Sequence, residues 1–140
     1  MYTQAETESF HRQFFDDWHA FDVSRFERHF TKDIIFKVGN EAEIRGLKAL
    51  EQHFAGVYAL LVRESHKHFR IDTVRDGTCI YNACEVSIVT KSRPEETVTL
   101  PALVYFVRVP PGEAEAGKIK EMTVYQDLGP LKAIIMSASA

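Results

Sequence analysis

The sequence predicts an α+β fold, in which about three N-terminal helices pack on a strongly curved, mostly antiparallel sheet and form a cone. Apolar residues recur at helical spacing over residues 4–21 and 47–63. The period then changes to two over four later segments: 66–75, 78–91, 98–109 and 117–131. Helices that precede a run of strands are typical of α+β proteins, and a twisted antiparallel sheet can curl around them and leave part of the interior open.

The helices are predicted from apolar stripes and from capping residues. The first, over residues 4–21, carries one stripe: Phe10, Phe14, Trp18 and Phe21. Thr3 and Glu6 have the spacing of a capping box at its start. Asp22 can cap a short second helix, and Leu47–Arg63 has the most regular helical period in the chain.

The strands are predicted from β-rich runs between turn signals. Two short extended pieces, Asp33–Val38 and Ala42–Arg45, precede the long helix. Asp76-Gly77 is expected to be the tight turn of a hairpin between the next two strands. The remaining segments are a connection, a third long strand, a polar loop and a last strand: Ser92–Glu96, Val98–Val109, Pro110–Gly117 and Gly117–Leu131. The tail 133–140 receives no assignment.

Composition limits the classes of function. A chain of 140 residues is long enough for one domain, expected to span residues 1–140. Its formal charge of −3 and the lack of a basic run argue against nucleic acid as a partner. The sequence has neither an apolar run of membrane-spanning length nor a secretory signal, and Cys79 and Cys84 are too far apart along one strand to pair. We therefore expect free thiols and a cytoplasmic protein that does not contact membranes.

Asp127 is the most suggestive titratable residue, because it ends a strand-like segment that also carries Tyr125. In a cavity, burial would raise its pKa toward the range of a general base, and the hydroxyl of Tyr125 could orient a ligand oxygen. The alternative is an Asp that caps the Gly129-Pro130 turn in solvent.

His66 and His68 share a face of the first long strand with Arg70 and Asp72. A neutral imidazole at either position could donate to a substrate oxygen, although a solvent-facing polar edge is the alternative. No further ligand at a telling spacing supports a metal site. Asn82 lies on the more apolar face of the next strand, where it needs hydrogen-bond partners and could contact a ligand.

Four sequence features together resemble the SnoaL-like polyketide cyclase group of the nuclear-transport-factor-like superfamily. They are the aromatic first helix with Trp18 and Asp22, the passage from 30 to 36, the Ile-Arg-Gly at 44–46, and the last strand with Glu121 and Asp127. The resemblance implies the cone fold and a homodimer formed through the outer face of the sheet. It also implies that Asp127, six residues after Glu121, acts as the base.

Other relatives with this fold match less well. At the positions that are polar in ketosteroid isomerase this chain has Phe14, Val38 and Leu103, so that chemistry is not expected. The pair His68-Phe69 is similar to a His-Phe pair of scytalone dehydratase.

The sequence and the resemblance together suggest a cofactor-independent enzyme that transfers protons during cyclisation, isomerisation or dehydration of a small, hydrophobic metabolite with a carbonyl group. Asp127 would be the acid or base, with His68 and Tyr125 orienting the substrate oxygen. The substrate-binding residues would be Phe14, Trp18, Phe54, Tyr58, His66, Asn82, Leu103 and Tyr105. The alternatives are a non-catalytic small-molecule-binding module of the same fold and a protein-interaction domain.

Overall fold

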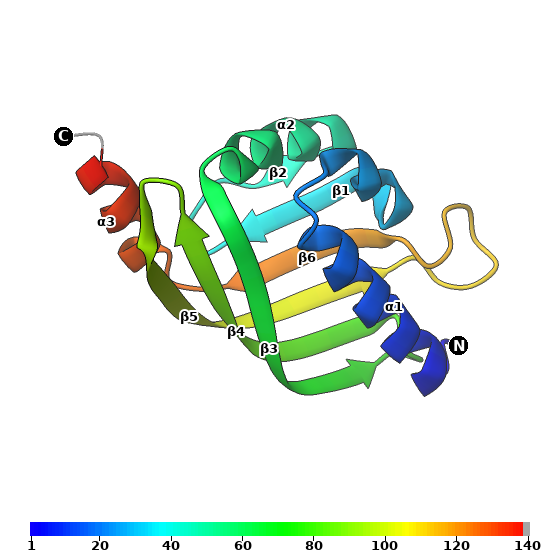
Figure 1. Ribbon diagram of the computed structural model, residues 1–140. Helices are drawn as coiled ribbons and strands as arrows, with labels where there is room; N and C mark the ends of the chain where they lie inside the picture. Colours follow the sequence, from blue (N-terminus) through cyan, green and yellow to red (C-terminus); the bar gives the residue numbers. More distant parts are fainter. Residues whose placement is uncertain (139–140) are drawn as a thin grey trace.

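The computed structural model describes residues 1–138, and its framework is a six-stranded sheet in the order β2-β1-β6-β5-β4-β3 (Figure 1). The strands are β1 Phe30–Val38, β2 Ile44–Arg45, β3 Leu61–Val74, β4 Cys79–Thr90, β5 Arg93–Arg108 and β6 Ile119–Tyr125. The helices are α1 Gln4–Trp18, the 3₁₀-helix η1 Val23–Arg28, α2 Leu47–Tyr58 and α3 Gly129–Ala138.

The sheet is mostly antiparallel, and only β1 and β6 pair in parallel. It curves strongly without closing into a barrel, so the α+β cone architecture is confirmed. A register shift between His68 and Arg70 marks a bulge in β3, and Figure 1 shows this strand bending midway. The bulge moves Arg70 to the outer face, opposite Ala83, so Arg70 does not share a face with the two histidines as predicted.

Helix α1 begins as the sequence predicts and presents two stripes to the sheet. The Thr3 hydroxyl accepts from the Glu6 N–H at 3.1 Å, and the Thr3 N–H donates to the Glu6 carboxylate at 2.7 Å. The predicted aromatic stripe packs in the core, with Phe14 only 1% exposed. A second stripe, which the sequence analysis did not identify, follows at spacings of four: His11, Phe15 and His19.

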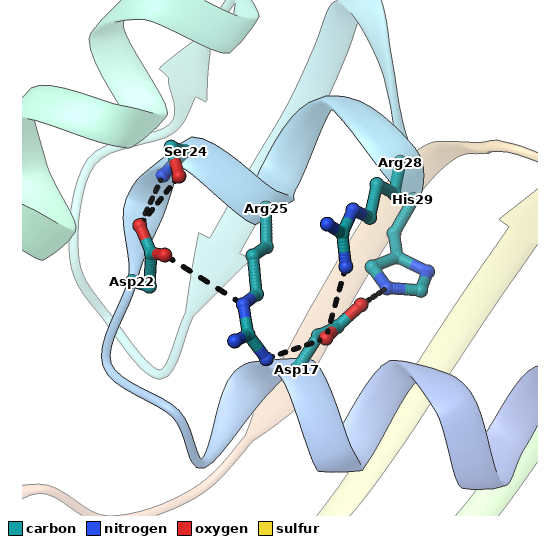
Figure 2. Close-up of polar contacts among 6 residues, drawn as sticks. All are labelled: Asp17, Asp22, Ser24, Arg25, Arg28 and His29. Atoms are coloured by element: carbon teal, nitrogen blue, oxygen red, sulfur yellow. Dashed lines mark hydrogen bonds and ion pairs between the residues drawn. The ribbon is translucent and has the colours of Figure 1, made fainter.

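An ionic cluster fixes the end of α1 against η1, as Figure 2 shows. Asp22 caps η1 by accepting from the Ser24 N–H at 3.0 Å, as predicted. Asp17 accepts from Arg25 at 3.0 Å and from His29 at 2.6 Å, and Arg28 lies 3.6 Å away. Burial opposes ionisation of Asp17, but the hydrogen bonds from His29 and Arg25 hold its pKa below the ordinary value. Asp17 therefore has a structural role between two helices.

The hydrophobic core lies between α1, α2 and the concave face of the sheet. Strand alternation supplies the inner face, for example Ile80, Val86, Val104 and Phe106, each at most 4% exposed. The Phe14 ring is 5.2 Å from Phe106 in an edge-on arrangement, which locks α1 across β5. The curved inner face and these two helices position the site.

Several predicted boundaries are corrected. Helix α2 ends at Tyr58 instead of Arg63, because Leu61 and the residues after it pair with β4. Strand β5 begins at Arg93, so the expected connection 92–96 is mostly strand. The last strand ends at Tyr125, and α3 follows, covering most of the tail that received no assignment. Residues 139 and 140 lie outside the described residues.

Two further features of the described chain are the state of its cysteines and the hydropathy of its helices. Cys79 and Cys84 are both free and buried, as predicted. Among residues 1–138, no helix combines the length and the hydropathy needed to cross a membrane.

Candidate active site

A cavity of about 300 Å³ opens between the helices and the concave face of the sheet. Its walls are mainly aromatic and aliphatic, and they include Trp18, Phe54 and His66 of the predicted set. The other lining residues are Phe15, Phe36, Val38, Glu41, His53, Val57, Leu60, Leu61, Glu64, Val86, Ile88, Val104, Met122, Val124, Gln126, Leu128, Leu131, Lys132 and Ile135. A concave, mostly apolar site with a few polar groups is the usual form of a small-molecule site.

Glu64 is a buried carboxyl group on the wall of this cavity. It extends inward from β3, and its side chain is only 12% exposed. The indole N–H of Trp18 donates to its Oε1 at 3.4 Å. Burial raises the pKa of Glu64 to about 7, because a carboxylate loses hydration there and this single hydrogen bond offsets only part of the loss. Both protonation states are then available near neutral pH.

His66 follows two residues later on the same face of β3. Its Nδ1 lies 2.7 Å from Nε2 of His19, and its Nε2 lies 3.7 Å from Oε1 of Glu64. Burial, and then the neighbouring His19, His68 and His11, lower the pKa of His66 to about 3. His66 is therefore a neutral imidazole at physiological pH.

Asn82 joins two further histidines to this group. Its side-chain oxygen lies 3.0 Å from Nε2 of His11 and 2.9 Å from Nδ1 of His68. Its amide nitrogen donates to the carbonyls of Arg70 and Ala83. Asn82 is fully buried and has the partners that a buried amide requires, so it orients histidines beside the cavity.

These six residues form the α1–β3 polar cluster: Glu64, His66, His68, His11, His19 and Asn82. The ring of Phe15 lies among its imidazoles, 4.7 Å from His11, 4.6 Å from His66 and 4.5 Å from His68. Among residues 1–138, no group of three or more His, Cys, Asp or Glu side chains has an arrangement that could hold a metal ion.

Two buried polar atoms near the cavity have no hydrogen-bond partner within residues 1–138. They are Nε2 of Gln126, which lines the cavity, and the hydroxyl of Tyr58. Burial and the nearby Glu64 raise the pKa of Tyr58, so its hydroxyl stays protonated. An unpartnered buried donor costs free energy, which a ligand oxygen could recover.

Asp127 and Tyr125 lie away from the cavity. Val124 and Gln126 point inward, so strand alternation turns their neighbours outward, and Tyr125 is 61% exposed. The exposed carboxylate of Asp127 accepts from the Gly129 N–H at 2.9 Å and caps α3. This geometry matches the capping alternative and does not support the expected acid–base role of Asp127.

The other predicted pocket residues lie on the outer face of the sheet, in the core or in the polar cluster. Leu103, 38% exposed, and Tyr105 point to the outer face of the sheet, because Val104 and Phe106 occupy the inner one. Tyr105 stacks on Tyr81 there. Phe14 is buried in the core behind the cavity. His68 belongs to the polar cluster but does not line the cavity.

The sequence analysis missed Glu64, His11, His19 and Gln126. Glu64 fell between the predicted end of the helix at 63 and the predicted start of the strand at 66. Had β3 been started at Leu61, the alternation Glu64-x-His66-x-His68 would have placed all three side chains on one face. His11 and His19 follow from the second stripe of α1.

Comparisons with known proteins agree with the cone architecture. No known family profile matches the chain. The sordarin/hypoxysordarin biosynthesis cluster protein G of Sordaria araneosa is 28% identical over 138 aligned residues, which span 94% of this chain and 88% of that protein.

Solved structures show the same fold at low sequence identity. SalBIII, described as an epoxide hydrolase/cyclase-like enzyme with a role in pyran ring formation in the polyether salinomycin, has a TM-score of 0.74 at 17% identity, covering 91% of this chain and 95% of that one. A provisionally assigned SnoaL-like polyketide cyclase of Shewanella denitrificans has a TM-score of 0.75 at 7% identity, covering 94% and 97%. The resemblance drawn from the sequence is therefore confirmed for the fold, and this chain has the nuclear-transport-factor-like cone fold of the SnoaL-like polyketide cyclases.

Proposed function

We propose that the protein is a cyclase-type enzyme that uses Glu64 as a general acid–base group on a small, largely apolar, oxygen-bearing metabolite. The observation that carries this proposal is a carboxyl group with a pKa of about 7 on the wall of an apolar cavity. General acid–base catalysis is most effective when the pKa of the catalytic group lies near the working pH. The names of the relatives, which refer to ring formation and biosynthesis, support a cyclase.

In the proposed reaction Glu64 moves a proton during ring closure. The carboxylate takes a proton from the attacking hydroxyl or from a carbon beside a carbonyl, and the electron pair that is released forms the new bond to an electrophilic carbon. At that carbon the C–O bond of an epoxide or the π bond of a carbonyl breaks, and its electron pair moves to the oxygen. The resulting carboxyl group then returns the proton to the oxygen that has gained negative charge. Isomerisation and dehydration use the same two half-steps and remain within the proposal. Only side chains of this chain are required.

Gln126 is the proposed binding partner of the substrate oxygen. Gln126 lines the cavity, and its amide nitrogen is buried without a hydrogen-bond partner, so a side-chain rotation would let it donate to a carbonyl, ether or epoxide oxygen. Lys132 at the cavity is paired with Glu41 and so provides no free cation for an anionic substrate. An uncharged substrate that carries a carbonyl group or a related oxygen is therefore the class that these walls favour.

A general probe of proton abstraction tests the proposal without knowledge of the natural substrate. When a base removes the ring C–H proton of 5-nitrobenzisoxazole, the N–O bond breaks and a coloured cyanophenolate is released. We expect turnover above the buffer reaction that rises through about pH 7 and falls about 100-fold or more in Glu64→Gln. Asp127→Asn, which alters the carboxylate first selected from the sequence, is the matched control and should keep the wild-type rate.

The results also separate the enzyme from a binding module. Full turnover in Glu64→Gln, or its loss in Asp127→Asn, would contradict the role of Glu64. A non-catalytic binding module is the second candidate, since two positions that are polar in ketosteroid isomerase hold the buried Phe14 and the half-buried Val38, which are both apolar. It predicts that the probe changes the fluorescence of Trp18, the single tryptophan, without being turned over.

We also propose that two copies pair through the outer face of the sheet. Aromatic and aliphatic groups gather there on neighbouring strands. They are the exposed Tyr81, Leu103 and Tyr125 and the half-buried Tyr105, here named the outer patch. Leu103 lies opposite Ala83 on one side and opposite Tyr125 on the other. An apolar patch of this kind favours association, and the family resemblance supports a second copy as the partner.

A further inference from the structure

Helix α1 lies across strand β3, and polar side chains of the two elements contact each other. The indole N–H of Trp18 donates to Glu64, and the adjacent His19 contacts His66. Toward the start of the helix, His11 packs against the ring of His68 and shares the side-chain oxygen of Asn82 with it.

One of these pairings leads from the cavity to the protein surface. Glu64 and His66 have side chains only 12% and 6% exposed, whereas His19 is half-buried at the C-terminal end of α1. The distances along the path are 3.7 Å from Glu64 Oε1 to His66 Nε2 and 2.7 Å from His66 Nδ1 to His19 Nε2. The first distance is within reach of a small side-chain rotation or one bridging water.

We propose that His66 and His19 form a two-imidazole proton relay that connects Glu64 in the cavity with solvent at the C-terminal end of α1. The inference rests on the proposed role of Glu64. His19 would act only through His66, which makes it a positioning residue for the proton and not a catalytic residue.

The relay balances without a charged intermediate. The Glu64 carboxyl gives its proton to His66 Nε2 while His66 Nδ1–H gives its proton to His19 Nε2, and His19 Nδ1–H releases a proton to water. Both imidazoles end neutral in the opposite tautomer, and a proton that returns along the same path restores the first tautomers. A concerted transfer suits this pair, because burial and the neighbouring histidines disfavour a charged His66.

The protein groups that surround the path do not exchange protons themselves near neutral pH. Phe15 packs 4.6 Å from the His66 ring and excludes water from that side. His11 and His68 are neutral, since burial lowers the pKa of each. Cys84 and Tyr58 stay protonated, because burial raises the pKa of both. At the outer end, burial lowers the pKa of His19, and the carboxylate of the exposed Asp16 partly offsets this.

Trp18 makes the relay measurable in the protein itself, because its N–H donates to Glu64 and it is the single tryptophan. Its fluorescence should titrate with a midpoint near 7 in the wild type and lose this transition in Glu64→Gln. A laser-induced pH jump from about pH 8 to about pH 6 then gives the rate at which Glu64 takes up a proton.

We expect His19→Gln, which keeps a hydrogen-bonding group beside His66, to slow this relaxation about 100-fold while the equilibrium midpoint stays near the wild-type value. Imidazole added to the buffer should restore the rate. His53→Gln is the matched control, because His53 is an exposed histidine that lines the cavity away from the relay, and its rate should remain that of the wild type.

The outcomes separate the relay from the role of Glu64. An unchanged relaxation rate in His19→Gln, or an equal slowing in His53→Gln, overturns the relay, since protons would then enter through the cavity. A shifted midpoint with an unchanged rate indicates a structural role for His19 and also overturns it. Lack of any transition near pH 7 in the wild type, or its persistence in Glu64→Gln, contradicts the assignment of Glu64 instead.

Discussion

Replacement of Glu64 by glutamine should stabilise the protein, and the gain should depend on pH. Glutamine keeps the shape of the side chain and cannot ionise. In the wild type the folded chain must hold a carboxylate in an apolar cavity at alkaline pH, whereas the unfolded chain holds it in water. The difference between the two proteins therefore reports the cost of the buried charge.

The magnitude follows from the raised pKa. The folded-state pKa of Glu64 is about 7, against 4.5 for an ordinary glutamate, so the folded state binds the proton more tightly. A raised pKa contributes stability that is fully present below about pH 4.5 and is lost as the pH rises through about 7. Between about pH 5 and about pH 8 the wild type should lose roughly 2 to 3 kcal/mol that Glu64→Gln does not lose.

Urea denaturation of both proteins at these two pH values measures the effect. Other titrating groups act alike in both proteins, so subtraction of the two free energies of unfolding isolates Glu64. The advantage of Glu64→Gln over the wild type should increase by roughly 2 to 3 kcal/mol from the lower to the higher pH. An advantage that is the same at both values would refute a buried, neutral Glu64 and with it the general acid–base proposal.

Two further predictions concern the histidines and the outer patch. The folded-state pKa of His66 is about 3, well below that of the unfolded chain, so its contribution to stability is present above about pH 6.5 and is lost as the pH falls. Between about pH 7 and about pH 5 the wild type should lose about 2 kcal/mol that His66→Gln keeps, measured by urea denaturation, and equal losses would contradict a neutral buried His66. Leu103→Glu should convert a two-chain species into single chains in sedimentation velocity, whereas Val62→Glu, also at an exposed position but on β3 outside the outer patch, should not. A wild-type protein that sediments as one chain would contradict the proposed dimer.

Patterns of period and capping predicted most of the fold. Three local features could be predicted because they depend only on neighbouring residues. They are the capping box of Thr3 and Glu6, the cap at Asp22 and the hairpin turn at Asp76-Gly77. The end of α2 was predicted wrongly. Leu61 fits the apolar period of the helix, but it is the first residue of β3, where its side chain is equally buried. Pairing with β4 decides between the two, and that pairing is non-local.

The site was predicted less well, because its chemistry depends on which face of a strand points inward. Strand alternation in the last strand places Val124 and Gln126 on one face and Tyr125 and Asp127 on the other. The family resemblance favoured the face of Asp127, and packing placed the opposite face in the cavity. The burial of Asn82 and its need for hydrogen-bond partners were predicted correctly, since its strand has one clearly apolar face, but Asn82 does not line the cavity.

The neutral histidines also explain why Glu64 can keep a raised pKa. A protonated His66 only 3.7 Å from Glu64 would stabilise the carboxylate and return its pKa toward the ordinary range. His19, His68 and His11 each oppose that protonation, in addition to burial. The raised pKa of Glu64 thus depends in part on residues that do not line the cavity, through the charge state of His66. Because burial is the largest effect on the pKa of His66, removal of His19 alone should leave His66 neutral and the pKa of Glu64 near 7.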